Sequence, residues 1–176
     1  MRGIFLGTIN EINWFLYKRK KFFPETNHKF LSYVPKDHQN HILLWFYIQL
    51  NVKEKSANLQ AAAVWAEYEN SCSTLKYLER PMSGEKSLAI AKIETHYFVN
   101  KCFINDNFIK KNIEKIAHIP AIIVQGRHDV ICPPFNALDL SKIWNAASID
   151  VIEDAGHSGF EDSIARKLIN ALYMIK

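Results

Sequence analysis

The last third of the chain alternates short apolar runs with amphipathic stretches. Residues 121–124 form a continuous apolar run that is typical of a buried parallel strand, and residues 148–152 form a second strand-like run. A helical stretch lies between them, from Pro133-Pro134 to about Trp144. An amphipathic C-terminal helix follows and carries Ile164, Leu168 and Leu172. The order strand, loop, helix, strand, loop, helix predicts part of a doubly wound α/β fold.

The first residues predict a strand followed by a helix. Residues 1–6 have the pattern of a short buried strand. Thr8 and Glu11 have the spacing of a capping box, in which each side chain bonds the backbone amide of the other residue. An amphipathic helix is expected after them, with an apolar face formed by Ile12, Phe15 and Leu16.

The middle of the chain predicts helices and no strands. Residues 38–50 are strongly apolar and helical in pattern. Ser56 is a candidate N-cap for the next helix, in which Trp65 and Glu69 share a face at i, i+4 spacing. Ser83 is a candidate start for a further helix. The apolar stripe of that helix is formed by Ile90, Ile93 and Tyr97, with Glu94 beside it.

The composition is that of a globular protein with the length of one ordinary domain. The 176 residues are 48% hydrophobic and 23% charged, with a formal net charge of +4. The basic run at residues 18–21 has two interpretations: a nucleic-acid or localisation patch, or a solvated turn after the amphipathic helix. We favour the solvated turn, and hence no nucleic-acid partner, because no other basic residues cluster with this run.

The cysteines and the apolar runs bear on the compartment. Cys72, Cys102 and Cys132 are far apart and lack CxxC spacing, which argues against a disulfide framework and against a zinc site. Residues 4–6 are too short an apolar stretch for the core of a signal peptide, and no run approaches the roughly 18 apolar residues of a membrane span. The sequence therefore predicts a cytoplasmic protein with no membrane partner, and it implies no metal or cofactor.

Candidate chemistry lies directly after the two strands predicted in the last third. Asp129 follows the first strand and His157 follows the second. Functional groups in an open α/β sheet cluster at the carboxyl ends of the strands, and acid followed by histidine is the order of α/β-hydrolase triads. In such a triad the acid orients the imidazole, which takes the proton of the serine. Taken singly, the aspartate is as well explained as a turn residue and the histidine as a surface residue.

Several segments resemble, in the same order, segments of the proline iminopeptidases. These enzymes are α/β-hydrolases that remove N-terminal proline and carry a helical cap between strands of the core. The resemblance implies the C-terminal part of that fold, with residues 1–7 as a core strand, 8–118 as a mainly helical cap and 119–176 as the end of the core. The segments are residues 119–133 (IPAIIVQGRHDVICP), 155–158 (AGHS), 2–6 (RGIFL), 11–15 (EINWF), 65–69 (WAEYE) and 93–100 (IETHYFVN).

The resemblance also assigns roles to single residues. Asp129 and His157 match the acid and base of the triad, and Glu69 and Glu94 match two cap glutamates that bind the free amine of the substrate. Carboxylates in an apolar pocket favour a charged terminus over an uncharged internal amide, so this role suits an exopeptidase. The remaining implied contacts with a peptide that begins with proline are Phe98, Tyr97 and Trp14 as walls of the ring pocket, and Cys132 near the active site.

The nucleophile that the resemblance requires is missing from the sequence. No Gly-x-Ser-x-Gly pattern occurs, and Ser158 adjoins the base and is not a candidate. We therefore expect a fragment that is inactive alone, with a complementary N-terminal half as a candidate partner. Two alternatives stay open: another capped α/β-hydrolase, such as an esterase or epoxide hydrolase, and a non-catalytic remnant or binding module. Departures from the family pattern include Tyr68 in place of a tryptophan and His128 in place of a tyrosine.

Overall fold

The chain folds into two units, each built from separate stretches of sequence. The structure is a computed structural model, and it describes residues 1–76 and 83–174. The sheet unit comprises residues 1–11, 72–77 and 105–176. The helical unit comprises residues 12–71 and 78–104. The chain therefore leaves the sheet unit twice and returns to it twice.

Two parallel strands form the centre of the sheet unit. They are β1 (Ala121–Gly126) and β2 (Ala147–Ile152), which pair from Ala121 opposite Ala147 to Gly126 opposite Ile152. This register makes the two strands end side by side at their carboxyl ends. Both strands lie where the apolar runs of the sequence predict them.

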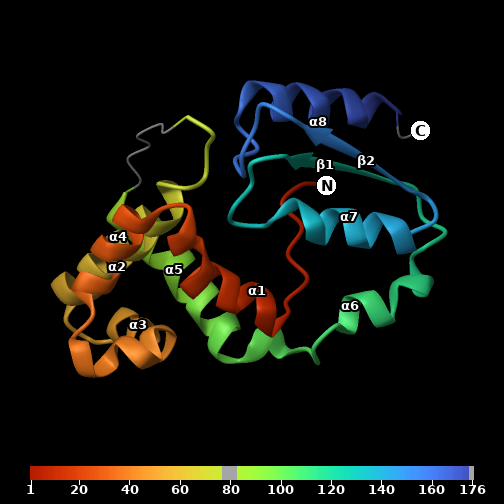
Figure 1. The fold of residues 1–176 in the computed structure, drawn as a ribbon. Coiled ribbons are helices and arrows are strands. Elements are labelled where there is room, and N and C mark those ends of the chain that lie inside the picture. The colour runs from red at the N-terminus through yellow and green to blue at the C-terminus, as the bar shows by residue number, and fades with distance from the viewer. Residues whose placement is uncertain (77–82, 175–176) are drawn as a thin grey trace. The chain divides into compact units, whose positions relative to one another are not determined.

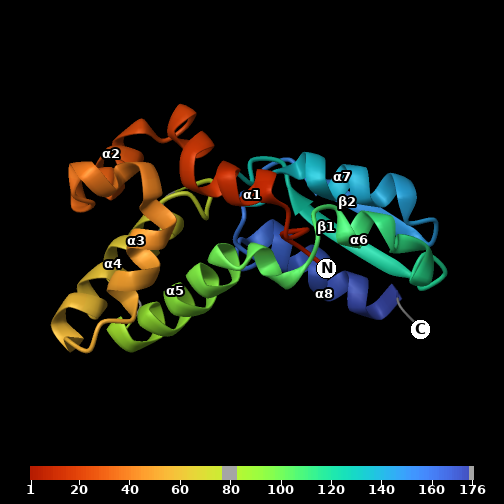
Figure 2. The same ribbon diagram turned by 90° about the horizontal axis from the view of Figure 1, so that it is seen from below.

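One helix covers each face of this small sheet. α7 (Pro134–Ile143) connects the strands and α8 (Asp162–Met174) follows β2, and Figures 1 and 2 show the two helices on opposite sides of the strands. Ile123 packs in a cluster with Leu140 of α7, whereas Val124 packs with Ile164 of α8. Alternate side chains of a strand point to opposite faces, so both faces are buried and the run is continuously apolar. This α/β arrangement is the one that the sequence predicts.

Residues 1–7 do not form the predicted strand. Met1 makes strand-like backbone hydrogen bonds to β1: its amine donates to the Ile122 carbonyl (2.6 Å) and its carbonyl accepts from the Val124 amide (2.7 Å). Gly3 and Gly7 then adopt φ values of +56° and +69°. These left-handed conformations are incompatible with extended backbone, so the pairing stops after Met1.

The predicted capping box is present and ties the N-terminal segment to α7. The Glu11 amide donates to Thr8 Oγ1 (3.2 Å), and the Thr8 amide donates to Glu11 Oε2 (3.0 Å), at the start of α1 (Ile9–Asn13). The same carboxylate accepts from the Leu6 amide (2.9 Å) and from Asn136 Nδ2 (2.7 Å) of α7. Glu11 is buried, and these donors replace the water that it has lost.

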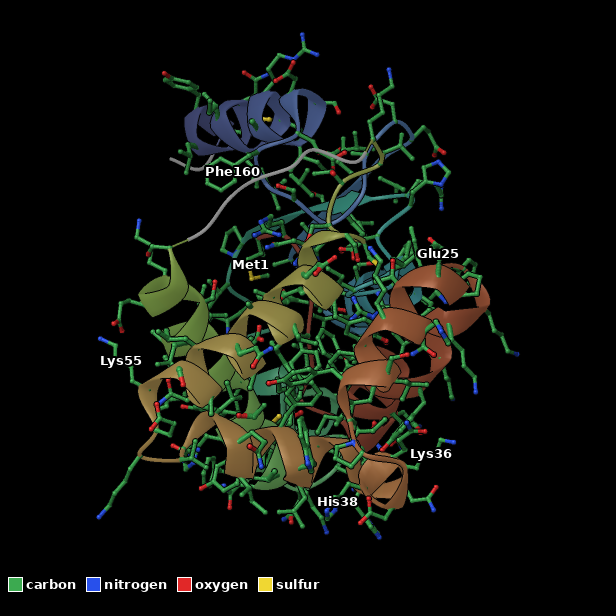
Figure 3. The ribbon with its side chains drawn as sticks, turned by 90° about the vertical axis from the view of Figure 1, so that its left-hand side faces the viewer. Met1, Glu25, Lys36, His38, Lys55 and Phe160 are labelled. Carbon is green, nitrogen blue, oxygen red and sulfur yellow. The ribbon has the colours of Figure 1, made fainter. Side chains whose placement is uncertain are left out.

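Four longer helices lie in the described part of the helical unit. α3, α4 and α5 pack against one another, and α2 packs against α4. Figure 3 shows their side chains filling the space between the helices, with Lys36, His38 and Lys55 projecting from the surface. The helices are α2 (Pro24–Tyr33), α3 (Ile42–Leu50), α4 (Lys55–Asn70) and α5 (Gly84–Val99). The shorter elements are a π-helical turn (Trp14–Lys18) and 3₁₀ turns at Arg19–Lys21, Lys36–His41 and Lys101–Phe103.

Aromatic rings form much of the core of the helical unit. Phe30 stacks on Tyr68 with ring centroids 4.0 Å apart and on Phe46 at 4.7 Å. Trp65 meets Phe46 edge to face at 5.3 Å. All four side chains are buried, so the aromatic content of the sequence is used here for packing.

Two details of the helices differ from the sequence prediction. Glu54, not Ser56, is the N-cap of α4, and its carboxylate accepts from the Ser56 amide (3.3 Å). In α5 the predicted stripe of Ile90, Ile93 and Tyr97 is exposed, and the face with Ala91 and Thr95 is buried. The small side chains on that face let neighbouring helices approach closely, whereas spacing alone does not reveal which face is buried. Ser83 caps α5 as predicted, with the Lys86 amide donating to its hydroxyl (3.4 Å).

The predicted cap at residues 8–118 is helical but is not one unit. Its described residues form helices and turns, and no strand. Residues 8–11, 72–77 and 105–118 nevertheless belong to the sheet unit. The last of these stretches contains α6 (Phe108–Lys111) and a 3₁₀ turn (Ile113–Lys115), and Ile113 joins the core beneath β1 and α7.

Candidate functional site

Asp129 and His157 meet at the carboxyl ends of β1 and β2. His157 Nδ1 lies 3.0 Å from Asp129 Oδ2 and 3.2 Å from Oδ1. A carboxylate only accepts hydrogen bonds, so Nδ1 is the donor and Nε2 is the basic nitrogen of the ring. The parallel register brings the two loops together because Gly126 and Ile152 end their strands opposite each other.

The Asp129 carboxylate is buried and held by several donors. Its side chain is 2% exposed. Oδ1 accepts from the amides of Ile131 (3.0 Å) and Cys132 (2.7 Å), and Oδ2 accepts from Gln125 Nε2 (3.1 Å). Backbone and buried side-chain donors leave this carboxylate little freedom to rotate, so the acid is fixed in the orientation that faces the imidazole.

Cys132 lies beside the acid as part of the same loop. Its side chain is buried, its amide donates to Asp129, and its carbonyl accepts from Gln125 Nε2 (3.0 Å). Gln125, at the end of β1, therefore bridges the acid and the Cys132 backbone. The structure thus places the predicted Cys132 with Asp129 and His157 in the sheet unit.

The backbone of the His157 loop is fixed by residues distant in sequence. The amides of His157 and Ser158 both donate to the Ser73 carbonyl, at 2.9 and 2.7 Å. The His157 carbonyl accepts from Arg2 Nη1 at 2.6 Å. Gly3 lies against the imidazole, since a Cβ on this residue would be 3.1 Å from His157 Cε1.

The two loops approach so closely that one glycine is obligatory. A Cβ on Gly126 would lie 1.9 Å from the Gly156 carbonyl oxygen and 2.7 Å from that of Ala155. Both atoms belong to the backbone and have no rotamer by which to move away. Glycine at position 126 is therefore what allows the strand end that carries the acid to lie against the loop that carries the histidine.

This arrangement is an acid–histidine pair suited to general base chemistry. The buried carboxylate fixes the orientation of the ring, which leaves Nε2 able to accept a proton from a reacting group. The same carboxylate stabilises the imidazolium that this proton transfer produces. The side chain of His157 is 17% exposed, so the ring is partly accessible while the acid is not.

Glu69 and Glu94 form a second cluster, within the helical unit. The indole Nε1 of Trp65 donates to Glu94 Oε2 at 2.7 Å. Burial, together with repulsion from the neighbouring Glu69 carboxylate, raises the pKa of Glu94 from 4.5 to about 8. The two carboxyl groups also share a hydrogen bond that favours the protonated form. At neutral pH this pair therefore carries one proton between its two carboxyl groups.

The three predicted aromatic walls, Phe98, Trp14 and Tyr97, have different ring neighbours. Phe98 is 6.4 Å from Trp65 and 5.6 Å from Phe15, between ring centroids, and so lies in the glutamate cluster. The Trp14 ring lies 6.2 Å from Phe22. Tyr97 is 49% exposed and packs edge to face on Phe103 at 5.5 Å. It follows Glu94 by three residues, yet its ring packs with the turn after α5 and not with Trp65.

Within residues 1–76 and 83–174, no group of three or more His, Cys, Asp or Glu side chains is placed to hold a metal ion. None of the described helices combines the length and the apolar character needed to cross a membrane.

Known proteins match the chain over nearly its whole length. It is 34% identical to a proline iminopeptidase of Xylella fastidiosa over 92% of its residues and 37% identical to one of Arabidopsis thaliana over 97%. It is 35% identical to a probable proline iminopeptidase of Leptolyngbya boryana, again over 97%. The chain is related to the proline iminopeptidases. This confirms the resemblance drawn from the sequence segments.

The chain spans about half the length of these proline iminopeptidases. The matched part is 53% of the Xylella fastidiosa protein, 47% of the Arabidopsis thaliana protein and 55% of the Leptolyngbya boryana protein. No protein-family model matches the chain.

Two residues near the glutamate pair, Phe15 and Arg19, were not predicted as site residues from the sequence. The Phe15 ring contacts both Trp65 and Phe98. Arg19 is fully buried, with Cζ 4.1 Å from the ring centroids of Phe15 and Tyr68. The solvated-turn interpretation of residues 18–21 is thus right for the three lysines and wrong for Arg19. The helical spacing of Phe15 and Arg19 was the available signal.

Proposed function

We propose that these 176 residues supply the acid–histidine pair and the amine-binding carboxylates of a prolyl aminopeptidase. In this proposal the chain corresponds to the C-terminal part of an α/β-hydrolase, and the helical unit is its cap. The observation that carries the proposal is the hydrogen-bonded Asp129–His157 pair at the carboxyl ends of two parallel strands. The relationship to proline iminopeptidases supports the same reaction class.

The catalytic role follows from the tautomer of His157. With Nδ1 donating to Asp129, Nε2 accepts the hydroxyl proton as a serine attacks the carbonyl carbon of the N-terminal proline. The imidazolium then returns this proton to the leaving amine, which breaks the peptide bond. Water repeats the cycle on the acyl-enzyme and releases proline. Asp129 stabilises the imidazolium in both halves of the reaction.

The serine and the oxyanion donors come, in this proposal, from polypeptide outside these residues. The sequence has no Gly-x-Ser-x-Gly elbow, and the members of a triad act as a unit. The isolated chain is therefore expected to have negligible peptidase activity. A complementary N-terminal half would supply both missing groups.

Recognition of the free amine is assigned to Glu69 and Glu94. At neutral pH the pair carries one proton, and a bound ammonium group replaces that proton as the partner of the second carboxylate. An internal peptide nitrogen has no charge to offer, so endopeptide binding is disfavoured. This pair favours an aminopeptidase over an esterase or epoxide hydrolase, whose neutral substrates have no use for two buried carboxyl groups.

The test is hydrolysis of proline 2-naphthylamide by this chain, alone and co-expressed with the part of the Xylella fastidiosa proline iminopeptidase that it does not match. Activity is expected only from the combination. D129N should abolish most of it, by about 10⁴-fold, since the wrong tautomer of the histidine is then stabilised. E94Q should abolish naphthylamide hydrolysis but spare hydrolysis of p-nitrophenyl acetate, which has no amine.

E67Q is the matched control, because Glu67 is exposed and lies on α4, the helix that carries Glu69. The two halves must first be shown to associate by co-purification. Associated halves that remain inactive on both substrates would refute the proposal. Equal loss of ester and amide hydrolysis in E94Q would instead favour the alternative hydrolases.

A further inference from the structure

Arg19 is a buried cation without a complete set of hydrogen-bond partners. Its neighbours Lys18, Lys20 and Lys21 are exposed, but Arg19 has no exposed surface. Its Nε donates to the Phe15 carbonyl at 3.1 Å, whereas neither Nη1 nor Nη2 has a hydrogen-bond partner within the described part of the chain. A buried guanidinium requires negative charge nearby to offset its loss of water.

The rings on either side of Arg19 connect it to the glutamate cluster. The guanidinium carbon lies 4.1 Å from the centroid of Phe15, and Phe15 lies 5.4 Å from Trp65, between ring centroids. The Trp65 indole in turn donates to Glu94. Arg19 attracts the ionised form of Glu94, and this attraction opposes the repulsion from Glu69. The three charged groups therefore belong to one buried network.

Among the residues that the structure describes, the elements packed around Glu94 contain no other buried cation. The sequence of α3, which packs against α5, contains no Asp, Glu, Lys or Arg, and Tyr47 is its titratable residue. On α5 itself, Lys92 and His96 line a surface depression of about 240 Å³ together with Tyr47. The turn after α5 contributes Lys101, which is exposed. Arg19 is thus the cation that acts on Glu94 from within the core.

We propose that Arg19 is a built-in counter-cation of the Glu69–Glu94 pair, which competes electrostatically with the ammonium group of an incoming substrate. The proposal rests on the amine-binding role of this pair stated above. With one proton on the pair, the cluster of one carboxylate, one carboxylic acid and one guanidinium is neutral. An ammonium group entering this cluster meets a pair whose negative charge is already balanced. Arg19 thereby lowers the affinity for free amines and makes amine recognition depend on the rest of the substrate.

Neutral substitution of Arg19 should strengthen the binding of both cations that the pair can take up, the proton and an ammonium group. Loss of the guanidinium removes an attraction for ionised Glu94, so its pKa rises above 8. Above that pH the pair is doubly ionised, and loss of the guanidinium also removes a repulsion against ammonium. A change of one pKa unit corresponds to about tenfold in affinity for either cation.

The experiment compares R19M and R19Q with K20M, which removes an exposed cation one residue away. Circular dichroism establishes that each variant is folded. The Glu94 carboxyl is titrated by ¹³C NMR without ligand, and binding of pyrrolidinium is measured by calorimetry about two pH units above the Glu94 pKa of the unsubstituted chain, where the pair is ionised in every variant. In R19M and R19Q the pKa should rise by about one unit, and pyrrolidinium should bind about tenfold more tightly. K20M should match the unsubstituted chain in both.

Should neither neutral variant fold, the unsubstituted chain still provides the test. The ¹⁵Nε resonance of Arg19 should then shift with the midpoint of the Glu94 titration, near pH 8. A Glu94 pKa shift without pyrrolidinium binding in any variant would refute the amine-binding role and leave the counter-cation role standing. The proposal would be overturned by an unchanged Glu94 titration or weaker pyrrolidinium binding in folded R19M and R19Q. It would also be overturned if the Arg19 resonance did not shift as Glu94 titrates.

Discussion

Replacing Glu94 by glutamine should remove a pH dependence from the stability of the helical unit. Glu94 is half-buried, and its carboxyl has a pKa of about 8 in the folded chain, compared with an ordinary value of 4.5. The folded state thus holds the proton more tightly than the unfolded state. The stability that comes from this proton is fully present below pH 4.5, declines as the pH rises, and is lost by about pH 8.

The shift sets the size of this decline. At about 1.4 kcal/mol per pKa unit, the rise of the Glu94 pKa from 4.5 to about 8 corresponds to about 5 kcal/mol of unfolding free energy. This energy belongs to the coupled Glu69–Glu94 pair. In E94Q the amide is neutral at every pH, and its oxygen can still accept from Trp65 Nε1, as Glu94 does. E94Q should therefore match the unsubstituted chain near pH 4.5 and exceed its stability by several kcal/mol at pH 8.

Urea unfolding followed by tryptophan fluorescence between pH 4.5 and 8.5 measures this difference. Three of the four tryptophans, Trp14, Trp45 and Trp65, lie in the helical unit, so the signal reports mainly on it. All other ionisable groups are the same in both proteins, so the comparison isolates the effect of Glu94. E67Q, at an exposed position of α4, is the control and should leave the pH profile unchanged. Parallel profiles for E94Q and the unsubstituted chain would refute the reasoning.

Two further substitutions test the loops that carry the acid and the histidine. In thermal unfolding, G126A should destabilise the sheet unit by more than about 3 kcal/mol, because its Cβ would lie 1.9 Å from the Gly156 carbonyl oxygen. The control G84A should change stability by less than about 1 kcal/mol, because the new Cβ faces a leucine side chain that can move. Q125L should cost about 2 kcal/mol, because it removes a buried donor to Asp129, and in the complemented enzyme it should lower kcat more than it changes KM. An unfolding temperature of G126A equal to that of G84A, or a Q125L enzyme with unchanged kcat, would contradict these expectations.

The parts of the fold that follow from local pattern are those the sequence predicts well. The apolar runs at residues 121–124 and 148–152 lie in β1 and β2, and helices follow where the periodicity changes. Parallel pairing then brings Asp129 and His157 together without further information. Their meeting could be predicted because it depends on strand order alone.

The features that the sequence did not reveal depend on contacts between distant residues. Arg19 lies in a run of four basic residues, a pattern that is typical of a solvated surface. One of the two rings that bury it belongs to Tyr68, about fifty positions further along the chain. The buried face of α5 is formed by small residues that packing selects and periodicity does not. At the N-terminus, Gly3 and Gly7 end the strand-like pairing through backbone conformations that the apolar pattern of residues 1–6 conceals.

The division of the chain into interleaved segments sets an order for folding during synthesis. Every residue of the helical unit has been translated once residue 104 is made, whereas the sheet unit still lacks both of its strands at that point. Glu11 cannot accept its hydrogen bond from Asn136 of α7 until residue 136 has been synthesised. The helical unit can therefore form on the ribosome, while residues 1–11 remain without their native partners until the last third has been made. Domains generally fold as units during translation, so the apolar side chains of residues 1–11 lack their packing partners during this interval.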